Sequence, residues 1–408
     1  MLPSATPAYS LGGVIYKNSN SIRVVSQLTN DRSGVVLWSD SANYPASQIS
    51  RVPHKVAIDV AVVIRCGLSG AATYREALPD EALSNYMRYC QEYWSYGGSK
   101  TLHFARRVVA SVPDFSWGWS AVGNGYVQSL HDEGDSRRAE ALRKAGRQAE
   151  DKALALDPRN GEALAHKAYL IDSRDWLGQE ALFRSAIAVK PLDCGCEHYG
   201  YGLKLQSVGR LAAAVAQFRA ATDMLALWPD SQLALANALV ATGQDDQAKP
   251  SFQAAIDLSK DPHFEQWLAV SEGMETGEYA SAMIALDSPD LQVSKPSRDA
   301  MLFAYEALVS GEPHAREKAV AMLVGLPERE RSSSVVRMLG ALGAPKEALQ
   351  AAGERPWLFW RRSMRGVLHE PTFSTVARQL GLVTYWKASR TKPDVCFEKS
   401  KPVFCSMV

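Results

Sequence analysis

The segment "CGCEH" at Cys194–His198 brings two thiols and one imidazole close together, and these groups are typical zinc ligands. A structural zinc site needs two to four residues between paired cysteines and a second pair of ligands elsewhere. Here Cys194 and Cys196 flank a single residue, and no second pair is evident. We therefore expect both cysteines to be structural residues at the beginning of a helix. We expect the chain to bind no metal and no other cofactor.

A second segment, "YWSYGGSKT" at Tyr93–Thr101, comes near the sequence of a phosphate-binding loop. That motif requires a glycine directly before the lysine, and position 99 is serine. Gly97 and Gly98 followed by Ser99 are instead typical of a turn between two helices. The eight histidines form no cluster with a nucleophile, the carboxylates fall at predicted solvent-facing helix positions, and no G-x-S-x-G motif is present. The sequence predicts no catalytic residue and a protein that is not an enzyme.

The composition of the 408-residue chain excludes several classes of partner. Its formal charge is +1, whereas nucleic-acid-binding domains usually carry a clear basic excess, so we expect no nucleic acid to be bound. The best apolar run, Val56–Leu68, is interrupted by Asp59 and Arg65 and is far shorter than the roughly 20 residues of a membrane span. No signal peptide follows Met1. We expect a soluble chain without a membrane span.

Six cysteines leave the cellular compartment open. They lie at positions 66, 90, 194, 196, 396 and 405, which is too scattered for a small disulfide scaffold. The interpretation that we favour is free thiols in a reducing cytoplasm. The alternative is a Cys396–Cys405 bridge in an oxidising compartment, and the chain is then periplasmic if a membrane segment is encoded upstream.

From about residue 80 onward the chain repeats one pattern every 34 residues. Glycines recur with this period at positions 209, 243, 277 and 311. Alanines lie five positions after the first three of these glycines, at 214, 248 and 282. A glycine ends the first helix of each pair because the left-handed cap conformation is accessible without a Cβ. The small alanines let a neighbouring helix approach closely. One helix pair cannot bury its apolar face alone, so the pairs are expected to stack into an elongated array.

This pattern resembles the tetratricopeptide repeat, and Trp119, Gly123 and Tyr126 match the signature of its first helix. The resemblance implies about seven units over residues 80–350, with a weaker one around Gly340–Glu354. The insertion "LHDEGDSRRAEALRKA" is expected to lengthen the helices of the second unit. The predicted fold class is mainly α, a tetratricopeptide-repeat superhelix. Its units begin near residues 82, 116, 161, 195, 229, 263 and 297.

Two flanking segments complete the predicted organisation. Strands at Tyr9–Tyr16, Ile22–Thr29 and Gly34–Asp40, followed by a helical stretch from Ile49, predict a small β-β-β-α module over residues 1–70. This module resembles the second half of a TolB-like domain, and residues 351–408 resemble the C-terminal capping segment of the same bacterial family. Its members usually carry a winged-helix or adenylate cyclase domain upstream. The resemblance implies that the other half of the sheet is encoded upstream.

In tetratricopeptide arrays the first helix of each unit lines a concave groove. Aromatic and amide side chains there suit an extended peptide or a helix of a protein partner, although each could instead pack between repeats. We predict a non-enzymatic protein-interaction scaffold. The alternative is the sensory or regulatory portion of a bacterial transcriptional regulator whose effector domain is not in this chain. The third candidate is the corresponding portion of an adenylate cyclase. The oligomeric state is left open. The predicted groove residues are Trp117, Asn124, Tyr169, Tyr199, Asn237, Trp267 and Tyr305.

Overall fold

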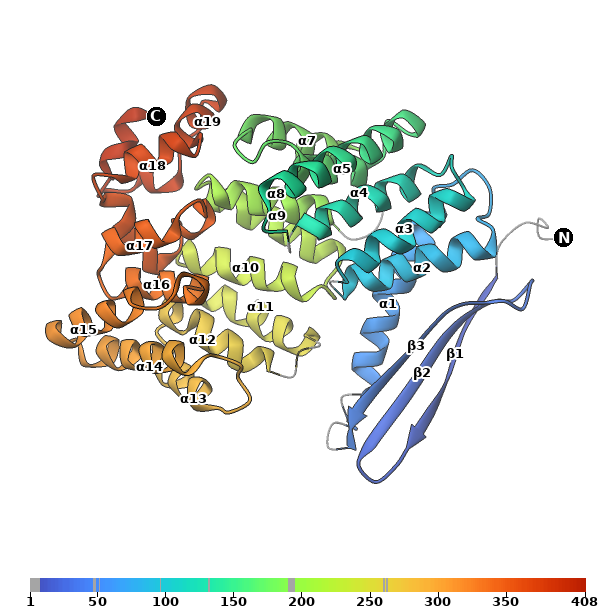
Figure 1. Ribbon diagram of the computed structural model, residues 1–408, viewed down its shortest axis with the longest axis horizontal. Coiled ribbons are helices and arrows are strands. Elements are labelled where there is room, and N and C mark those ends of the chain that lie inside the picture. Colours follow the sequence, from blue (N-terminus) through green and yellow to red (C-terminus); the bar gives the residue numbers. More distant parts are fainter. Residues whose placement is uncertain are drawn as a thin grey trace. The chain divides into compact units, whose positions relative to one another are not determined.

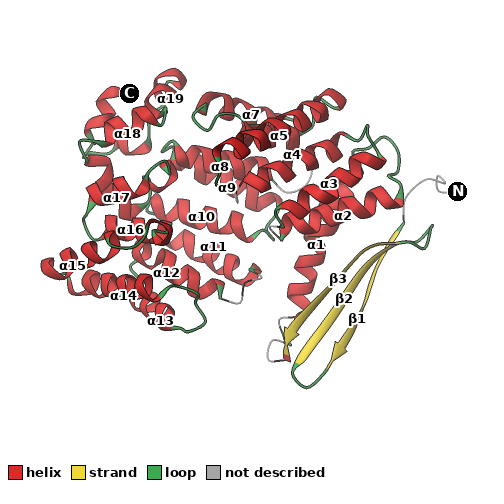
Figure 2. Ribbon diagram, viewed as in Figure 1, coloured by secondary structure: helices red, strands yellow, loops and turns green. Residues whose placement is uncertain are grey.

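The computed structural model describes residues 8–46, 49–50, 52–95, 97–130, 133–189, 195–259, 261 and 263–408. The chain forms two compact units, Met1–His198 and Tyr199–Val408, and each is described by itself. Strands lie near the N-terminus and helices make up most of the remainder (Figure 2). The predicted class, mainly α with a small β module, is confirmed.

The first unit begins with a sheet of three antiparallel strands in the order β1-β2-β3. Helix α1 (Val52–Ala71) follows the sheet, and its Val52 packs against Ile22 and Val24 of the second strand. The first strand is exposed along almost its whole length. The third strand begins later than predicted because Gly34 takes a φ of +72° in the preceding turn. The strand bounds are Tyr9–Lys17, Ser21–Asn30 and Val36–Pro45.

Among the described residues eight helix pairs follow, and within each unit consecutive pairs pack side by side (Figure 1). The first seven pairs begin within two residues of the predicted starts. The second pair contains the longest helix, which has 21 residues and confirms the expected extension. The bounds are α2 Asp80–Trp94, α3 Ser99–Ser111, α4 Ser116–Leu130, α5 Ser136–Leu156, α6 Gly161–Leu170, α7 Trp176–Ala188, α8 Cys196–Ser207, α9 Leu211–Met224, α10 Pro229–Ala241, α11 Asp245–Leu258, α12 Phe264–Thr276, α13 Tyr279–Asp287, α14 Lys295–Ser310, α15 Pro313–Val324, α16 Ser333–Ala341 and α17 Pro345–Ala352.

The glycines of the 34-residue period have the backbone conformation that the period predicts. Gly209, Gly243, Gly277 and Gly311 have φ angles of 79°, 77°, 84° and 70°, each at the junction between the two helices of a pair. Residues with a Cβ rarely adopt this left-handed region, which explains why glycine recurs there. Five positions later, buried alanines pack the second helix of the pair against its neighbours. Together these features give the second unit the geometry of tetratricopeptide-type repeats.

After the last pair, the chain continues in short helical segments that share an aromatic core. The rings of Phe373 and Trp386 lie 4.9 Å and 5.5 Å from the ring of Phe404, and all three side chains are buried. Among the described residues, none of the helices combines the length and the apolar character needed to cross a bilayer. The segments after the last pair are α18 Phe373–Gln379 and α19 Leu382–Ser389, with 3₁₀ turns at Pro356–Leu358, Arg362–His369, Asp394–Phe397 and Val403–Met407. One further 3₁₀ turn, Glu328–Glu330, lies between α15 and α16.

Candidate functional site

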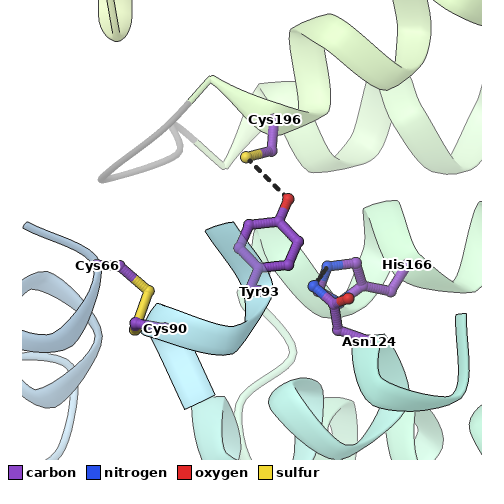
Figure 3. The surroundings of a disulfide bond; sticks show 6 residues. All are labelled: Cys66, Cys90, Tyr93, Asn124, His166 and Cys196. Atoms are coloured by element: carbon purple, nitrogen blue, oxygen red, sulfur yellow. Dashed lines mark hydrogen bonds between the residues drawn. A yellow bond between two sulfur atoms is a disulfide. The ribbon is translucent and has the colours of Figure 1, made fainter. Parts of the chain in front are cut away.

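In the first unit, His166 of α6 lies between two buried carboxylates. Its Nδ1 is 3.2 Å from Oε1 of Glu150 on α5, and its Nε2 is 3.2 Å from Oε2 of Glu162, one turn earlier on α6. Helix α4 contributes Ser120, whose Oγ is 3.1 Å from Nδ1, and Asn124, whose Nδ2 is 3.0 Å from Nε2. Figure 3 shows the Asn124 amide facing the imidazole. The packing of α4 on both α5 and α6 brings these five side chains together.

The charges of this cluster depend on one another. Burial raises the pKa of the Glu150 carboxyl to about 7, against the opposing attraction of His166. Burial alone lowers the pKa of His166, but hydrogen bonds to Glu150 and Glu162 outweigh it and raise that pKa to about 10. At neutral pH the imidazole is therefore a cation, held between the side chains of Glu150 and Glu162. This arrangement ties three helices together inside the unit.

A disulfide and Tyr93 lie beside the cluster (Figure 3), and Tyr93 continues a row of stacked rings formed with Tyr86 and Tyr89 on α2. Cys66 of α1 is bonded to Cys90 of α2, and the ring of Tyr93, one turn beyond Cys90, points its hydroxyl at Sγ of Cys196, 3.6 Å away. A cavity of about 20 Å³ lies between these tyrosines and His166. It has room for about one water molecule, which is too small for an organic ligand. The cluster is therefore structural in character, with no space for a substrate.

The interpretation of the cysteines as free thiols is wrong for all five that the structure describes. Cys66 is bonded to Cys90, and Cys396 is bonded to Cys405, as the alternative predicted. Within the part of the chain that the structure describes, no cysteine is free. Cys194 lies outside the described residues.

We expect replacement of both Cys66 and Cys90 by serine to lower the free energy of unfolding by about 3 kcal/mol. The bridge joins residues 24 positions apart and restricts the unfolded chain accordingly. Urea unfolding, followed by circular dichroism, measures the change, and reductant should lower the stability of the wild type by at least as much. A variant that unfolds at the same urea concentration as the wild type would contradict this expectation.

The second unit contains a buried network of two carboxylates and two guanidinium groups. Glu272 and Glu275 come from α12, Arg337 comes from α16, and Arg361 comes from the segment after α17. Nη1 of Arg337 is 3.2 Å from Oε2 of Glu272 and 3.4 Å from Oε1 of Glu275. Arg361 pairs with both carboxylates, and its Nε is 3.4 Å from Oε1 of Glu275. No side chain of the four is more than 7% exposed.

The network is balanced in charge, which allows it to be buried. Burial opposes ionisation of Glu275, but the guanidinium groups of Arg361 and Arg337 outweigh it and lower the pKa of that carboxyl. Backbone N–H and Oγ of Ser363 also donate hydrogen bonds to Glu275, at 3.0 Å and 2.7 Å. Removal of a single member of such a network leaves a charge without compensation in a medium of low polarity.

Arg361 and Arg362 of the C-terminal segment also form hydrogen bonds with α10 and with the first residue of α11, on the predicted groove face of the second unit. Arg361 donates to Oδ1 of Asn237 at 3.2 Å, and Arg362 donates to the Val240 carbonyl at 2.8 Å and to Asp245 at 2.6 Å. Nearby, the indole N–H of Trp360 donates to the Ser207 carbonyl at the end of α8. The chain therefore covers part of the face of α10 and α12 with its own residues 360–363.

The structure divides the seven predicted groove residues into three groups. Trp117, Asn124 and Tyr305 are at most 7% exposed: Trp117 lines the small cavity, Asn124 contacts His166, and the Tyr305 hydroxyl donates to the Val270 carbonyl. These three pack inside their units, as the alternative for each position allowed.

The other four differ in accessibility. Asn237 is engaged by Arg361, and Tyr199 packs its ring 4.3 Å from the ring of Trp228. Tyr169 and Trp267 are exposed at 40% and 45%. Trp267 lies beside Phe264 on the first turn of α12, with the two ring centres 5.6 Å apart. These two side chains are the most exposed of the seven predicted groove residues.

No group of three or more His, Cys, Asp or Glu side chains among the described residues is placed to hold a metal ion. The segment Gly97–Ser99 links α2 to α3 as a turn, as predicted. A cleft of about 380 Å³ lies between α17 and α18, and Lys346, Gln350 and Val376 are among the residues that line it.

No family model and no characterised protein sequence matches this chain. Solved structures that align with it include the tetratricopeptide-repeat protein TTC0263 of Thermus thermophilus, with 18% identity, a TM-score of 0.35, and coverage of 45% of this chain and 99% of that one. The MamA protein aligns with 16% identity and a TM-score of 0.28, over 44% of this chain and 92% of its own. The tetratricopeptide-repeat domain of P58(IPK) aligns with 12% identity and a TM-score of 0.23, over 76% and 92%.

Proposed function

We propose that this chain is a non-enzymatic protein-interaction scaffold that binds a peptide or helix through its repeat array. The observation that carries the proposal is the exposed indole of Trp267, which packs beside the half-buried ring of Phe264 on the first turn of α12. Large aromatic side chains of this kind dominate the binding energy of many interfaces. The four-member charge network anchors the last turns of the same helix through Glu272 and Glu275.

Selection of peptides tests the proposal directly. A random peptide library is selected on the wild type, and enriched peptides are then measured for affinity to Trp267→Ala. Loss of a central aromatic contact should weaken binding at least thirtyfold, the size of an interface hot spot. Trp357→Ala is the matched control, because Trp357 is 39% exposed but lies outside the predicted groove. Enriched peptides that bind Trp267→Ala as tightly as the wild type would rule out this surface as the binding groove.

A second candidate is the sensory portion of a bacterial regulator, and the Cys66–Cys90 bridge favours it. This bridge joins α1 of the N-terminal module covalently to α2, the first helix of the array. Stable disulfides persist in oxidising compartments, so we propose that the chain works outside the reducing cytoplasm, for instance in a periplasm. Under this proposal the module and the first helix pair transmit a signal as one body. Labelling of the native protein with a thiol reagent that cannot cross membranes, before and after reduction, tests the compartment.

A further inference from the structure

The disulfide-closed loop Cys396–Cys405, "CFEKSKPVFC", carries two of the most exposed large apolar side chains among the described residues. Phe397 is 74% exposed and Val403 is 78% exposed. Apolar side chains exposed singly are common at protein surfaces, so the distinguishing feature here is that both stand on one short, disulfide-closed loop. The loop is rigid because its own Phe404 is buried against Trp386 and the disulfide closes its base.

The charges around the two apolar side chains indicate the kind of partner. Lys399 and Lys401 lie between them in sequence and are exposed, and no ion pair joins either lysine within the described residues. The only acidic residue of the loop, Glu398, is neutralised by Arg365, whose Nη1 is 2.6 Å from both of its carboxylate oxygens. From Arg378 to Val408 the chain has six basic and two acidic residues, although the whole chain is nearly neutral. The partner surface is therefore negatively charged.

We propose that this loop docks the protein onto an anionic lipid surface. Phe397 and Val403 enter the boundary between headgroups and acyl chains, while Lys399 and Lys401 contact the lipid phosphates. A lipid surface fits better than a protein partner, because projecting apolar side chains next to lysines need no complementary pocket in the headgroup layer. The site is separate from the proposed peptide groove, so either can fail without the other.

Vesicle co-sedimentation of the full chain tests this proposal. Vesicles of phosphatidylcholine alone are compared with vesicles containing about one third phosphatidylglycerol, in low salt and in 0.5 M salt, which reduces the range of electrostatic attraction to roughly 4 Å. We expect binding to the anionic vesicles only, and weaker binding in high salt. Lys399→Gln with Lys401→Gln should weaken binding roughly thirtyfold, and Phe397→Ser with Val403→Ser at least tenfold.

Matched controls separate docking by the loop from general attraction between charges. Lys144→Gln with Lys152→Gln removes two exposed lysines of the first unit, and Ile284→Ser removes an apolar side chain that is 75% exposed. Both should bind like the wild type. All substituted side chains are exposed, so the variants should fold, which circular dichroism verifies. The proposal is overturned if the wild type does not sediment with anionic vesicles, or if the loop variants bind no worse than the controls. Binding to an acidic protein without any binding to vesicles would also overturn it.

Discussion

Arg361→Met should lower the free energy of unfolding of the second unit by about 3–5 kcal/mol. The guanidinium of Arg361 is 5% exposed and lies against Glu272 and Glu275, so its removal leaves a buried excess of negative charge. Methionine keeps much of the apolar stem, and the change therefore tests charge more than volume. Urea unfolding followed by tryptophan fluorescence is a suitable measurement, because Trp360 is the neighbouring residue in the chain and is buried.

Arg365→Met is the matched control for this prediction. Arg365 belongs to the same basic segment but is 43% exposed, and its ion pair with Glu398 is accessible to solvent. Exposed pairs contribute between zero and about 1 kcal/mol, so this variant should be close to the wild type. Addition of Glu272→Gln to Arg361→Met should recover part of the loss, because one carboxylate then no longer requires a counter-charge. If Arg361→Met and Arg365→Met have the same free energy of unfolding, the network does not hold the C-terminal segment in place.

Periodic features of the fold could be predicted from the sequence because they depend on local chemistry. The glycines 34 residues apart take left-handed conformations between helices, and this requirement acts on each glycine independently of its distant neighbours. Helix starts follow from the same period. The hairpin strands were also predictable, since alternation and turn residues act over a few positions.

Contacts between distant parts of the chain were not predictable in the same way. The carboxylates were predicted to face solvent, yet Glu150, Glu272 and Glu275 are buried and paired with cations, and Arg361 is 89 positions from Glu272. A charged residue on one helix gives no local sign that a counter-charge will arrive from the C-terminal segment. For the same reason Cys66 and Cys90 gave no sign of pairing, since their contact depends on how α1 packs against α2.

Three of the predicted groove residues are buried for a related reason. The repeat pattern identifies which residues of a first helix face inward, but not whether another segment covers them. Asn124 faces inward and meets His166, and Asn237 faces inward and meets Arg361. The amide groups thus contact charged groups of the chain itself, whereas the rings of Tyr169 and Trp267 are exposed.

The charge cluster of the first unit makes the stability of the protein depend on pH. The pKa of His166 is raised to about 10 in the folded chain, so its stabilising contribution is complete below about pH 6.5 and is lost as the pH rises towards 10. The pKa of Glu150 is raised to about 7, so ionisation of this carboxyl also disfavours the folded state as the pH rises from about 4.5 to 7. Both titrations act in the same direction, so the free energy of unfolding should fall as the pH rises from about 5 to 10.

His166→Gln should therefore lower the free energy of unfolding by about 3–5 kcal/mol at pH 8, because Glu150 and Glu162 then share a buried site without a cation. At pH 5 the loss should be no more than about half as large, since Glu150 takes up a proton and removes one of the two negative charges. Urea unfolding at both pH values measures the difference. His314→Gln, which changes a histidine that is 94% exposed, should have no effect at either pH. An equal loss for His166→Gln at pH 5 and pH 8 would mean that His166 contributes through packing and hydrogen bonds, and that its charge does not stabilise the unit.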